Sequence, residues 1–209
     1  MAAKIKPKLI GIAGGSASCK TTIAKALAAR LPGSIVIGED DYYRCSTSYP
    51  SFDASTHNFD EPAAKDDELL CAHLALARAG KAFEKPLYNL KTHTREKETE
   101  RVGPADFMIV EGLHVLATQA LCASFDLRIY TEAEESLRLG RRMIRDVMER
   151  DRTPQSVLTQ FFTNVRPMHE LHVAPQKPRA DLVLTSTFEG GYPETDRNVE
   201  KVLATLGVS

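Results

Sequence analysis

The stretch Gly14-Gly15-Ser16-Ala17-Ser18-Cys19-Lys20-Thr21-Thr22 lies between an apolar run at 9–13 and a helical pattern that begins at Ile23. A phosphate-binding loop is formed where a strand is followed by a loop of small residues, a Lys-Thr pair and a helix. Backbone N–H groups and the positive end of the helix dipole attract phosphate oxygens there. In such a loop Lys20 reaches the β- and γ-phosphates, and the Thr21 hydroxyl binds Mg²⁺. The stretch therefore predicts a nucleotide site that follows the first strand.

The loop departs from the pattern G-x-x-x-x-G-K-[ST] at one position, where Cys19 replaces the second glycine. If this position requires a positive φ, the cysteine costs roughly 1–2 kcal/mol. An ordinary Gly/Ser turn before a helix is the alternative interpretation. A thiol beside Lys20 at a helix N-terminus is also expected to be reactive. Cys45 follows the next candidate loop, so redox sensitivity is a further hypothesis.

Length and composition indicate one globular domain over residues 1–209, with 43% hydrophobic and 26% charged residues. The net charge of −1 argues against nucleic-acid binding, which depends on clustered positive charge. No apolar run approaches the roughly 18 residues of a membrane span, and no signal-peptide pattern is present. We therefore expect a cytoplasmic protein that binds neither nucleic acid nor membrane. The four scattered cysteines predict free thiols rather than a zinc site.

Apolar runs alternate with helical patterns along the chain, which is typical of a parallel sheet covered by helices on both faces. We expect about five strands, at Leu9–Ala13, Ser34–Gly38, Phe107–Glu111, Leu127–Tyr130 and Leu182–Thr185. One predicted helix begins at Asp66 or Asp67 and ends before Gly80. Its apolar face carries Leu70, Leu74 and Ala77, and a later helix carries a second apolar stripe, Leu137, Ile144, Val147 and Met148.

In parallel sheets, ligands bind at the carboxyl ends of the strands, so acidic residues at those ends are candidates for catalysis. Asp40 follows the second strand and is our candidate for the base that accepts a hydroxyl proton, with Asp41 as the local competitor. Glu111 ends the third strand and is a candidate metal ligand together with Thr21. A solvated acidic turn and a simple strand-end carboxylate are the alternatives.

Two further segments are distinctive. Residues 83–102 are polar and rich in Thr and Tyr, which predicts a β-hairpin lobe for substrate recognition, although Tyr88 and His93 could instead serve hairpin packing. Residues 138–156 are rich in arginine. They predict either a solvated, salt-bridged helix or an arginine lid over a triphosphate. We favour the lid because a phosphate loop is present.

The chain resembles the uridine kinases (uridine–cytidine kinases) from about Leu9 to Thr187. Beside the phosphate loop, the motifs that carry the resemblance are Asp40-Asp41-Tyr42-Tyr43-Arg44, Asn58-Phe59-Asp60-Glu61-Pro62, the run from Pro86 to Arg95, Val110-Glu111-Gly112, Arg141-Arg142-Met143-Ile144-Arg145-Asp146 and Val165-Arg166-Pro167-Met168-His169-Glu170. The resemblance implies a P-loop kinase fold and transfer of the γ-phosphate of ATP or GTP to the 5′-hydroxyl of uridine or cytidine. It also implies Mg²⁺ and a homo-oligomer, commonly a tetramer.

The resemblance assigns roles to individual residues. It implies that Asp40 is the catalytic base, that Asp60 holds the ribose hydroxyls and that Lys20, Arg145 and Arg150 act in catalysis. Glu189 falls near the region that contacts the nucleotide base. The expected substrate-binding residues are Tyr43, Phe59, Asp60, Tyr88, His93, Arg142, Arg152 and Gln160. Because a neutral imidazole both donates and accepts, His93 is expected to accommodate uracil and cytosine alike.

The sequence departs from the family pattern at two positions, and two alternative functions stay open. Asn89 stands where the family usually has Asp, and Cys19 stands in the phosphate loop. One alternative is a P-loop kinase of another alcohol, such as ribulose 5-phosphate or pantothenate. The other is a regulatory nucleotide-binding module that has lost catalysis. We expect an active enzyme because Lys20, Asp40 and Glu111 are retained.

Overall fold

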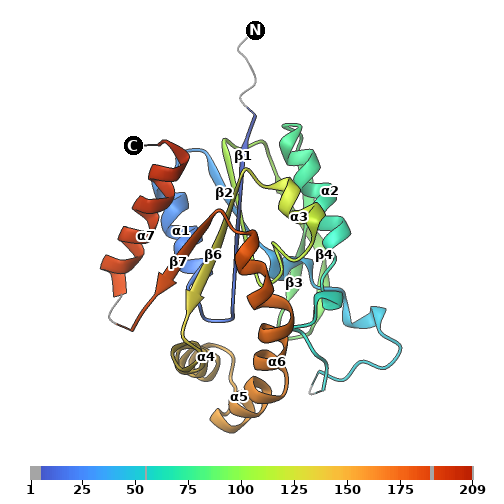
Figure 1. The fold of residues 1–209 in the computed structure, drawn as a ribbon. Coiled ribbons are helices and arrows are strands. Elements are labelled where there is room, and N and C mark those ends of the chain that lie inside the picture. The colour runs from blue at the N-terminus through green and yellow to red at the C-terminus, as the bar shows by residue number, and fades with distance from the viewer. Residues whose placement is uncertain (1–5, 55, 189–190, 209) are drawn as a thin grey trace.

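The computed structural model describes residues 6–54, 56–188 and 191–208 and is built around a five-stranded sheet in the order β2-β5-β1-β6-β7 (Figure 1). All neighbouring strands of this sheet pair in parallel. The strands are β1 (Lys8–Gly14), β2 (Ser34–Gly38), β5 (Phe107–Gly112), β6 (Leu127–Ala133) and β7 (Leu182–Ser186). The expected α/β class and the five-stranded parallel sheet are confirmed.

Helices cover both faces of the sheet (Figure 1), because β1 is apolar on both sides. Ile10 and Ile12 belong to one buried cluster, with residues of α1 and α7. Leu9 and Ala13 belong to the other cluster, with residues of α2 and α3. These helices are α1 (Lys20–Arg30), α2 (Asp67–Arg78), α3 (Gln119–Ser124) and α7 (Gly191–Leu206). The central strand is thereby buried on both faces, as the continuous apolar run predicts.

The start of α2 is set by Asp66, whose side chain accepts a hydrogen bond from the backbone N–H of Leu69 at 3.3 Å. Of the two capping candidates, Asp66 is therefore the N-cap. Beyond the helix, Gly80 adopts a positive φ of 65°, the left-handed conformation that favours glycine. The apolar face predicted for this helix is buried and comprises Leu70, Leu74 and Ala77.

Residues 83–102 form a separate two-stranded antiparallel sheet, made of β3 (Phe83–Asn89) and β4 (Thr94–Val102). The Asn89 carboxamide oxygen accepts hydrogen bonds from the N–H groups of Lys91 and Thr92 in the connecting turn. At the end of that turn, His93 adopts a φ of 57°. The turn chemistry thus places the His93 side chain at the tip of the ribbon.

The helix α4 (Glu135–Glu149) contradicts one prediction. Its buried side chains are the polar Arg138, Arg142 and Asp146, whereas Ile144 is 63% and Met148 78% exposed. The expectation that the apolar stripe of this helix faces the core is therefore wrong. The helix lies at the carboxyl end of the sheet (Figure 1), where its charged face meets the polar loops that follow the strands.

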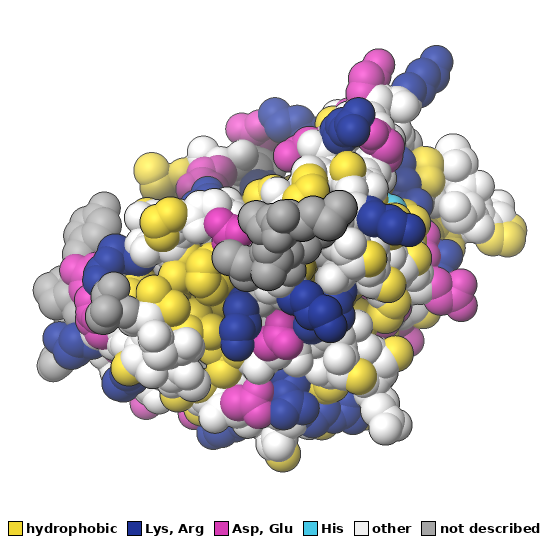
Figure 2. All heavy atoms as spheres, turned by 90° about the horizontal axis from the view of Figure 1, so that it is seen from above, with side chains coloured by type: hydrophobic (Ala, Val, Ile, Leu, Met, Phe, Trp, Pro, Cys, Tyr) yellow, Lys and Arg dark blue, Asp and Glu magenta, His cyan; other side chains and the backbone are white. Residues whose placement is uncertain are grey.

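Beyond α4 the chain continues through α5 (Pro154–Gln160) and α6 (Arg166–Met168), which are joined by a π-helical stretch, Phe161–Val165. The opposite end of the molecule, where the strands begin, is shown in Figure 2. Basic and acidic side chains are intermixed on this face. Within the described ranges, none of the helices has the length and apolar character needed to cross a bilayer.

Candidate active site

A cavity of about 1020 Å³ opens at the carboxyl ends of the strands. Most of the site residues expected from the sequence line it: Ser16, Ala17, Ser18, Cys19, Lys20, Thr21, Thr22, Asp40, Tyr43, Phe59, Asp60, His93, Glu111, Arg142, Arg145, Arg150, Arg152 and Gln160. Gly14, Gly15 and Tyr88 do not line it. Glu189 lies outside the described residues. The fold therefore gathers segments from positions 16 to 160 around one space.

The loop between β1 and α1 has the backbone of a phosphate cradle. Cys19 adopts a φ of 71° and Ala17 a φ of 62°, so the positive φ foreseen at the second glycine position is present and is borne by a cysteine. The Lys20 ammonium donates to the Gly15 carbonyl at 2.9 Å. Burial lowers the pKa of Lys20, and the nearby Glu111 carboxylate opposes this effect.

Two side chains that carry oxygen atoms meet beside the loop. The Thr21 hydroxyl donates to the Glu111 carboxylate at 2.8 Å, so the first helix and the end of β5 each supply one oxygen. Burial raises the pKa of Glu111, against the attraction of Lys20. Mg²⁺ binds in proteins to one or two such oxygens and completes its shell with phosphates and waters, so these residues fit that cation.

Asp40 lies in a short helical turn after β2 and is held by a lysine from a distant segment. The Lys65 ammonium, which is fully buried, lies 2.6 Å from Asp40 and 3.8 Å from Glu39, over the Tyr43 ring at 3.4 Å. The surrounding protein partly desolvates Asp40, which would raise its pKa, but Lys65 outweighs this effect, with help from Lys20, and keeps the pKa below its usual value. The carboxylate is therefore ionised and available as a hydrogen-bond acceptor.

The neighbouring carboxylate has a different environment. Asp41 forms an ion pair with Lys85 of β3 and does not line the large cavity. The side chain of Asp40 does line it and is 55% exposed there. The geometry therefore separates two carboxylates that the sequence alone left as competitors.

The far end of the cavity combines one carboxylate with aromatic rings. Asp60 is buried, and burial raises its pKa against the opposing pull of Arg142. The Phe59 and His93 rings stack with centroids 4.7 Å apart, and Tyr43 lies against both Phe59 and Tyr88. Burial lowers the pKa of His93, which favours its neutral form. A polar carboxylate beside flat rings suits a ligand with hydroxyl groups and a planar base.

The arginines at the end of α4 converge on Asp146, which is fully buried. The nearest contacts are those of Arg145 at 2.8 Å and Arg142 at 3.4 Å. Arg150 and Arg152 lie 3.7 and 3.9 Å away. We call these five residues the Asp146 cluster.

Arg142 connects the Asp146 cluster to the phosphate loop. Its guanidinium donates to the Ser16 hydroxyl at 2.8 Å and to the Gln160 carboxamide oxygen at 2.7 Å, and Arg152 also donates to Gln160. Arg138, on the preceding turn of α4, lines a different cavity. The large cavity is therefore lined by Arg141, Arg142, Arg145, Arg150 and Arg152, whereas Arg138 lines the smaller one.

Sequence reasoning missed three buried residues that organise this site: Glu39, Lys65 and Asp146. Asp146 follows Arg142 by four positions, a spacing that indicates an ion pair on a helix. Glu39 accepts from the backbone N–H of His114 and packs so closely on Gly112 that a Cβ there would clash. No local pattern indicates Lys65, because its acidic partners, Asp40 and Glu39, lie 25 or more residues earlier.

Comparison with known proteins agrees with this geometry. The model of the phosphoribulokinase/uridine kinase family matches residues 9–190. The chain belongs to this family. It is similar to a uridine kinase of Bacillus cytotoxicus, with 43% identity over 96% of this chain and 95% of the relative. A uridine kinase of Brevibacillus brevis is 39% identical over 89% of this chain and 86% of the relative.

A solved structure gives the same result for the fold. Phosphoribulokinase from Rhodobacter spheroides superposes with a TM-score of 0.62 at 15% identity, covering 87% of this chain and 71% of that chain. Both enzymes in the family's description are kinases, and by this membership the present chain is a kinase with a nucleotide phosphate donor.

Proposed function

We propose that this protein is a nucleoside kinase that transfers the γ-phosphate of ATP or GTP to the 5′-hydroxyl of uridine or cytidine, giving UMP or CMP. One observation carries the proposal: a single cavity is lined by a phosphate loop, an ionised Asp40 and a buried Asp60 beside aromatic rings. The names of the relatives support a nucleoside as the acceptor.

In this proposal the donor's triphosphate lies along the loop. Lys20 leaves the Gly15 carbonyl to contact the β- and γ-phosphates, and Arg142, Arg145, Arg150 and Arg152 neutralise charge on the moving phosphoryl group. Thr21 and Glu111 hold Mg²⁺, which would supply further neutralisation of phosphate charge when bound.

Asp40 accepts the proton of the 5′-hydroxyl as the new bond to phosphorus forms. A low pKa makes it a weak base, but a loose transition state needs orientation of the hydroxyl more than full proton removal. Asp60 holds the ribose hydroxyls. Phe59, Tyr43, Tyr88 and His93 contact or support the base.

The finer properties belong to the same proposal. Cytoplasmic location, assembly into a homo-oligomer and Mg²⁺ dependence follow from the resemblance to uridine kinases. A coupled assay with uridine, cytidine, ribulose 5-phosphate and pantothenate, each with ATP and GTP, tests donor and acceptor together. If the protein phosphorylated only ribulose 5-phosphate or only pantothenate, that alcohol would be the acceptor and the nucleoside assignment would be wrong. Nucleotide binding without turnover of any acceptor would favour a regulatory module.

The role of Asp40 has a direct test in the pair Asp40→Asn and Asp41→Asn. Loss of a positioned base reduces turnover by about 10²–10⁴-fold, so we expect this loss in kcat for Asp40→Asn with little change in ATP affinity. Asp41→Asn is the matched control and should keep kcat within a few-fold, because Asp41 pairs with Lys85 outside the cavity. A near-normal kcat in Asp40→Asn would show that Asp40 is not the catalytic base.

A further inference from the structure

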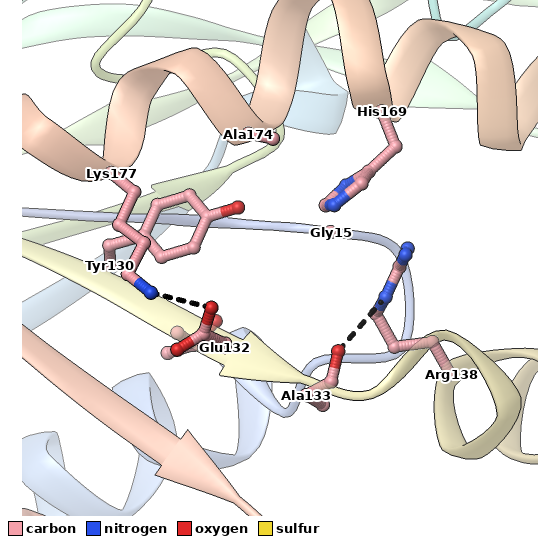
Figure 3. Close-up of a pocket in the computed structure, with 9 residues that line it drawn as sticks. Gly15, Tyr130, Glu132, Ala133, Arg138, His169, Ala174 and Lys177 are labelled. Atoms are coloured by element: carbon pink, nitrogen blue, oxygen red, sulfur yellow. Dashed lines mark hydrogen bonds and ion pairs between the residues drawn. The ribbon is translucent and has the colours of Figure 1, made fainter.

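A second, smaller cavity of about 90 Å³ lies against Gly15 and shares no lining residue with the large cavity (Figure 3). The end of β6, the first turn of α4 and the segment after α6 enclose it. Its lining residues are Gly15, Tyr130, Thr131, Glu132, Ala133, Arg138, His169, Ala174 and Lys177. Nothing in the proposed kinase mechanism uses this space.

The cavity contains a buried cation whose hydrogen bonds are incomplete. Arg138 is 3% exposed, and its Nε donates to the Ala133 carbonyl at 3.3 Å. Its Nη1 finds no hydrogen-bond partner within the described part of the chain, and neither does Nδ1 of His169. Figure 3 shows both side chains pointing toward the space beside Gly15. A Cβ built on Gly15 would lie 2.7 Å from Nη1 and 2.9 Å from Nδ1.

The charged neighbours of the cavity pair with one another rather than with Arg138. Lys177 pairs with Glu132 at 2.7 Å. Glu135, the carboxylate at the start of α4, attracts Arg138 but pairs with Arg166 at 3.3 Å, and Arg166 also pairs with Glu170 at 3.2 Å. His169 is neutral near pH 7, because burial and the adjacent Arg138 lower its pKa to about 4. Within the described residues, no carboxylate lies within ion-pair distance of Arg138. Burying a guanidinium without such a partner is strongly unfavourable, and water in the cavity reduces this cost without removing it.

We propose that this cavity binds a small inorganic anion, held by Nη1 of Arg138 and Nδ1 of His169. A neutral imidazole can carry its proton on Nδ1 and donate it, so two donors converge on the anion. The volume exceeds the roughly 30 Å³ of one water molecule and suits a halide or a tetrahedral oxyanion, but not a nucleotide. Because both donors lie against Gly15, the anion braces the start of the phosphate loop.

Bromide is the first probe. Crystals of the wild-type protein soaked in sodium bromide should show an anomalous peak in hydrogen-bond contact with Nη1 of Arg138. A parallel soak in sodium sulfate distinguishes a halide site from an oxyanion site. Absence of density beside Arg138 in both soaks overturns the proposal.

Thermal unfolding gives a second, independent measurement. At constant ionic strength, exchange of gluconate for chloride at ten times its Kd should raise Tm by about 3–5 °C. Arg138→Gln should abolish this rise. So should Lys177→Gln, which leaves Glu132 unpaired beside the cavity but changes a side chain that is 44% exposed and should not prevent folding.

The matched control is Arg128→Gln, which removes an arginine from the same strand β6 but leaves the cavity intact. It should keep the full rise in Tm. An equal rise in Arg128→Gln and Lys177→Gln overturns the proposal, because the effect would then be independent of the cavity. Neither measurement involves nucleotide or turnover, so its outcome is separate from that of the proposed kinase activity.

Discussion

At the scale of single residues, Cys19 holds a backbone conformation in which L-residues are strained. Its φ of 71° is in the left-handed region, and its thiol contacts the Ser186 hydroxyl at 3.6 Å. Cys45, the other thiol of the redox hypothesis, accepts a hydrogen bond from Thr47, and this bond lowers its pKa. The two thiols thus have separate polar contacts, and both are free.

Cys19→Gly should stabilise the protein. Relief of the left-handed conformation gains roughly 1–2 kcal/mol, and the greater freedom of glycine in the unfolded chain removes about half of it. We expect the free energy of unfolding to rise by about 0.5–1 kcal/mol in urea titrations. Cys19→Ala is the control, since it removes the thiol and keeps the strain. A gain of equal size in both variants would show that the thiol, not the backbone, is responsible.

Asp40 and Lys65 illustrate how one contact sets the ionisation of a catalytic candidate. Lys65 keeps the pKa of Asp40 below its usual value, so the base form persists to lower pH than in a free carboxylate. The pKa of Lys65 is itself raised: burial opposes this, but Asp40, Tyr43 and Glu39 together outweigh burial.

The pH profile of kcat/KM tests this pairing. In Lys65→Met, the pKa of Asp40 should rise, because the cation that lowers it is gone while partial desolvation still raises it. Activity is lost as pH falls through this pKa, so the acidic limb of the profile should move to higher pH. Lys85→Met, which affects Asp41 instead, should leave the limb in place. An unmoved limb in Lys65→Met would exclude Asp40 as the titrating group.

At the scale of elements, α4 acts as a support for arginines. Its buried face carries Asp146 with Arg142, while Ile144 and Met148 face outward. A carboxylate surrounded by four guanidiniums offsets their mutual repulsion, which would otherwise drive these side chains apart. The element therefore places positive charge beside the phosphate loop before any phosphate is present.

Asp146→Asn keeps the shape of this side chain and removes its charge. Loss of one partner from a buried ionic cluster typically costs 3–5 kcal/mol, and we expect a loss of about this size in unfolding free energy. At temperatures where the variant is folded, kcat/KM should fall at least tenfold, because the arginines are no longer held together. Glu135→Gln, at the other end of the same helix and outside the large cavity, is the control and should be near neutral. An unchanged kcat/KM in Asp146→Asn would show that Asp146 does not position the arginines for the reaction.

At the scale of the whole molecule, two buried clusters lie on opposite faces of one sheet. The cluster under α1 and α7 includes Leu27, which is fully buried, whereas Met148 lies outside both clusters. Because α1 begins at the phosphate loop, the packing of this cluster also fixes the direction from which Lys20 and Thr21 enter the site.

Leu27→Ala and Met148→Ala compare the loss of unfolding free energy at a buried position with that at an exposed position. The first should lower the unfolding free energy by about 2–5 kcal/mol through the cavity that it leaves. The second should change it by less than about 0.5 kcal/mol. Chemical unfolding of both variants at one protein concentration is the measurement. A large loss in Met148→Ala would indicate that another surface covers this residue, as in the expected homo-oligomer, and size-exclusion chromatography would then report the assembly.

The sequence by itself determined the phosphate loop, the five parallel strands and the acidic residues at their ends. These features are local: a continuous apolar run, a glycine-rich turn and a Lys-Thr pair each lie within a dozen residues. The positions of Asp40 and Glu111 followed from the rule that ligands bind at the carboxyl ends of parallel strands. Their chemical roles remain predictions.

Only the tertiary structure decided which of two carboxylates faces the cavity, which face of α4 is buried and where Arg138 points. Asp40 and Asp41 are adjacent in sequence, and their difference arises from Lys65 and Lys85, which come from separate segments. The apolar stripe of α4 led to a wrong prediction because the helix packs against the polar loops at the end of the sheet, and its charged face is the one that is buried. Burial and pairing depend on which distant segments meet, and no periodicity within one segment contains that information.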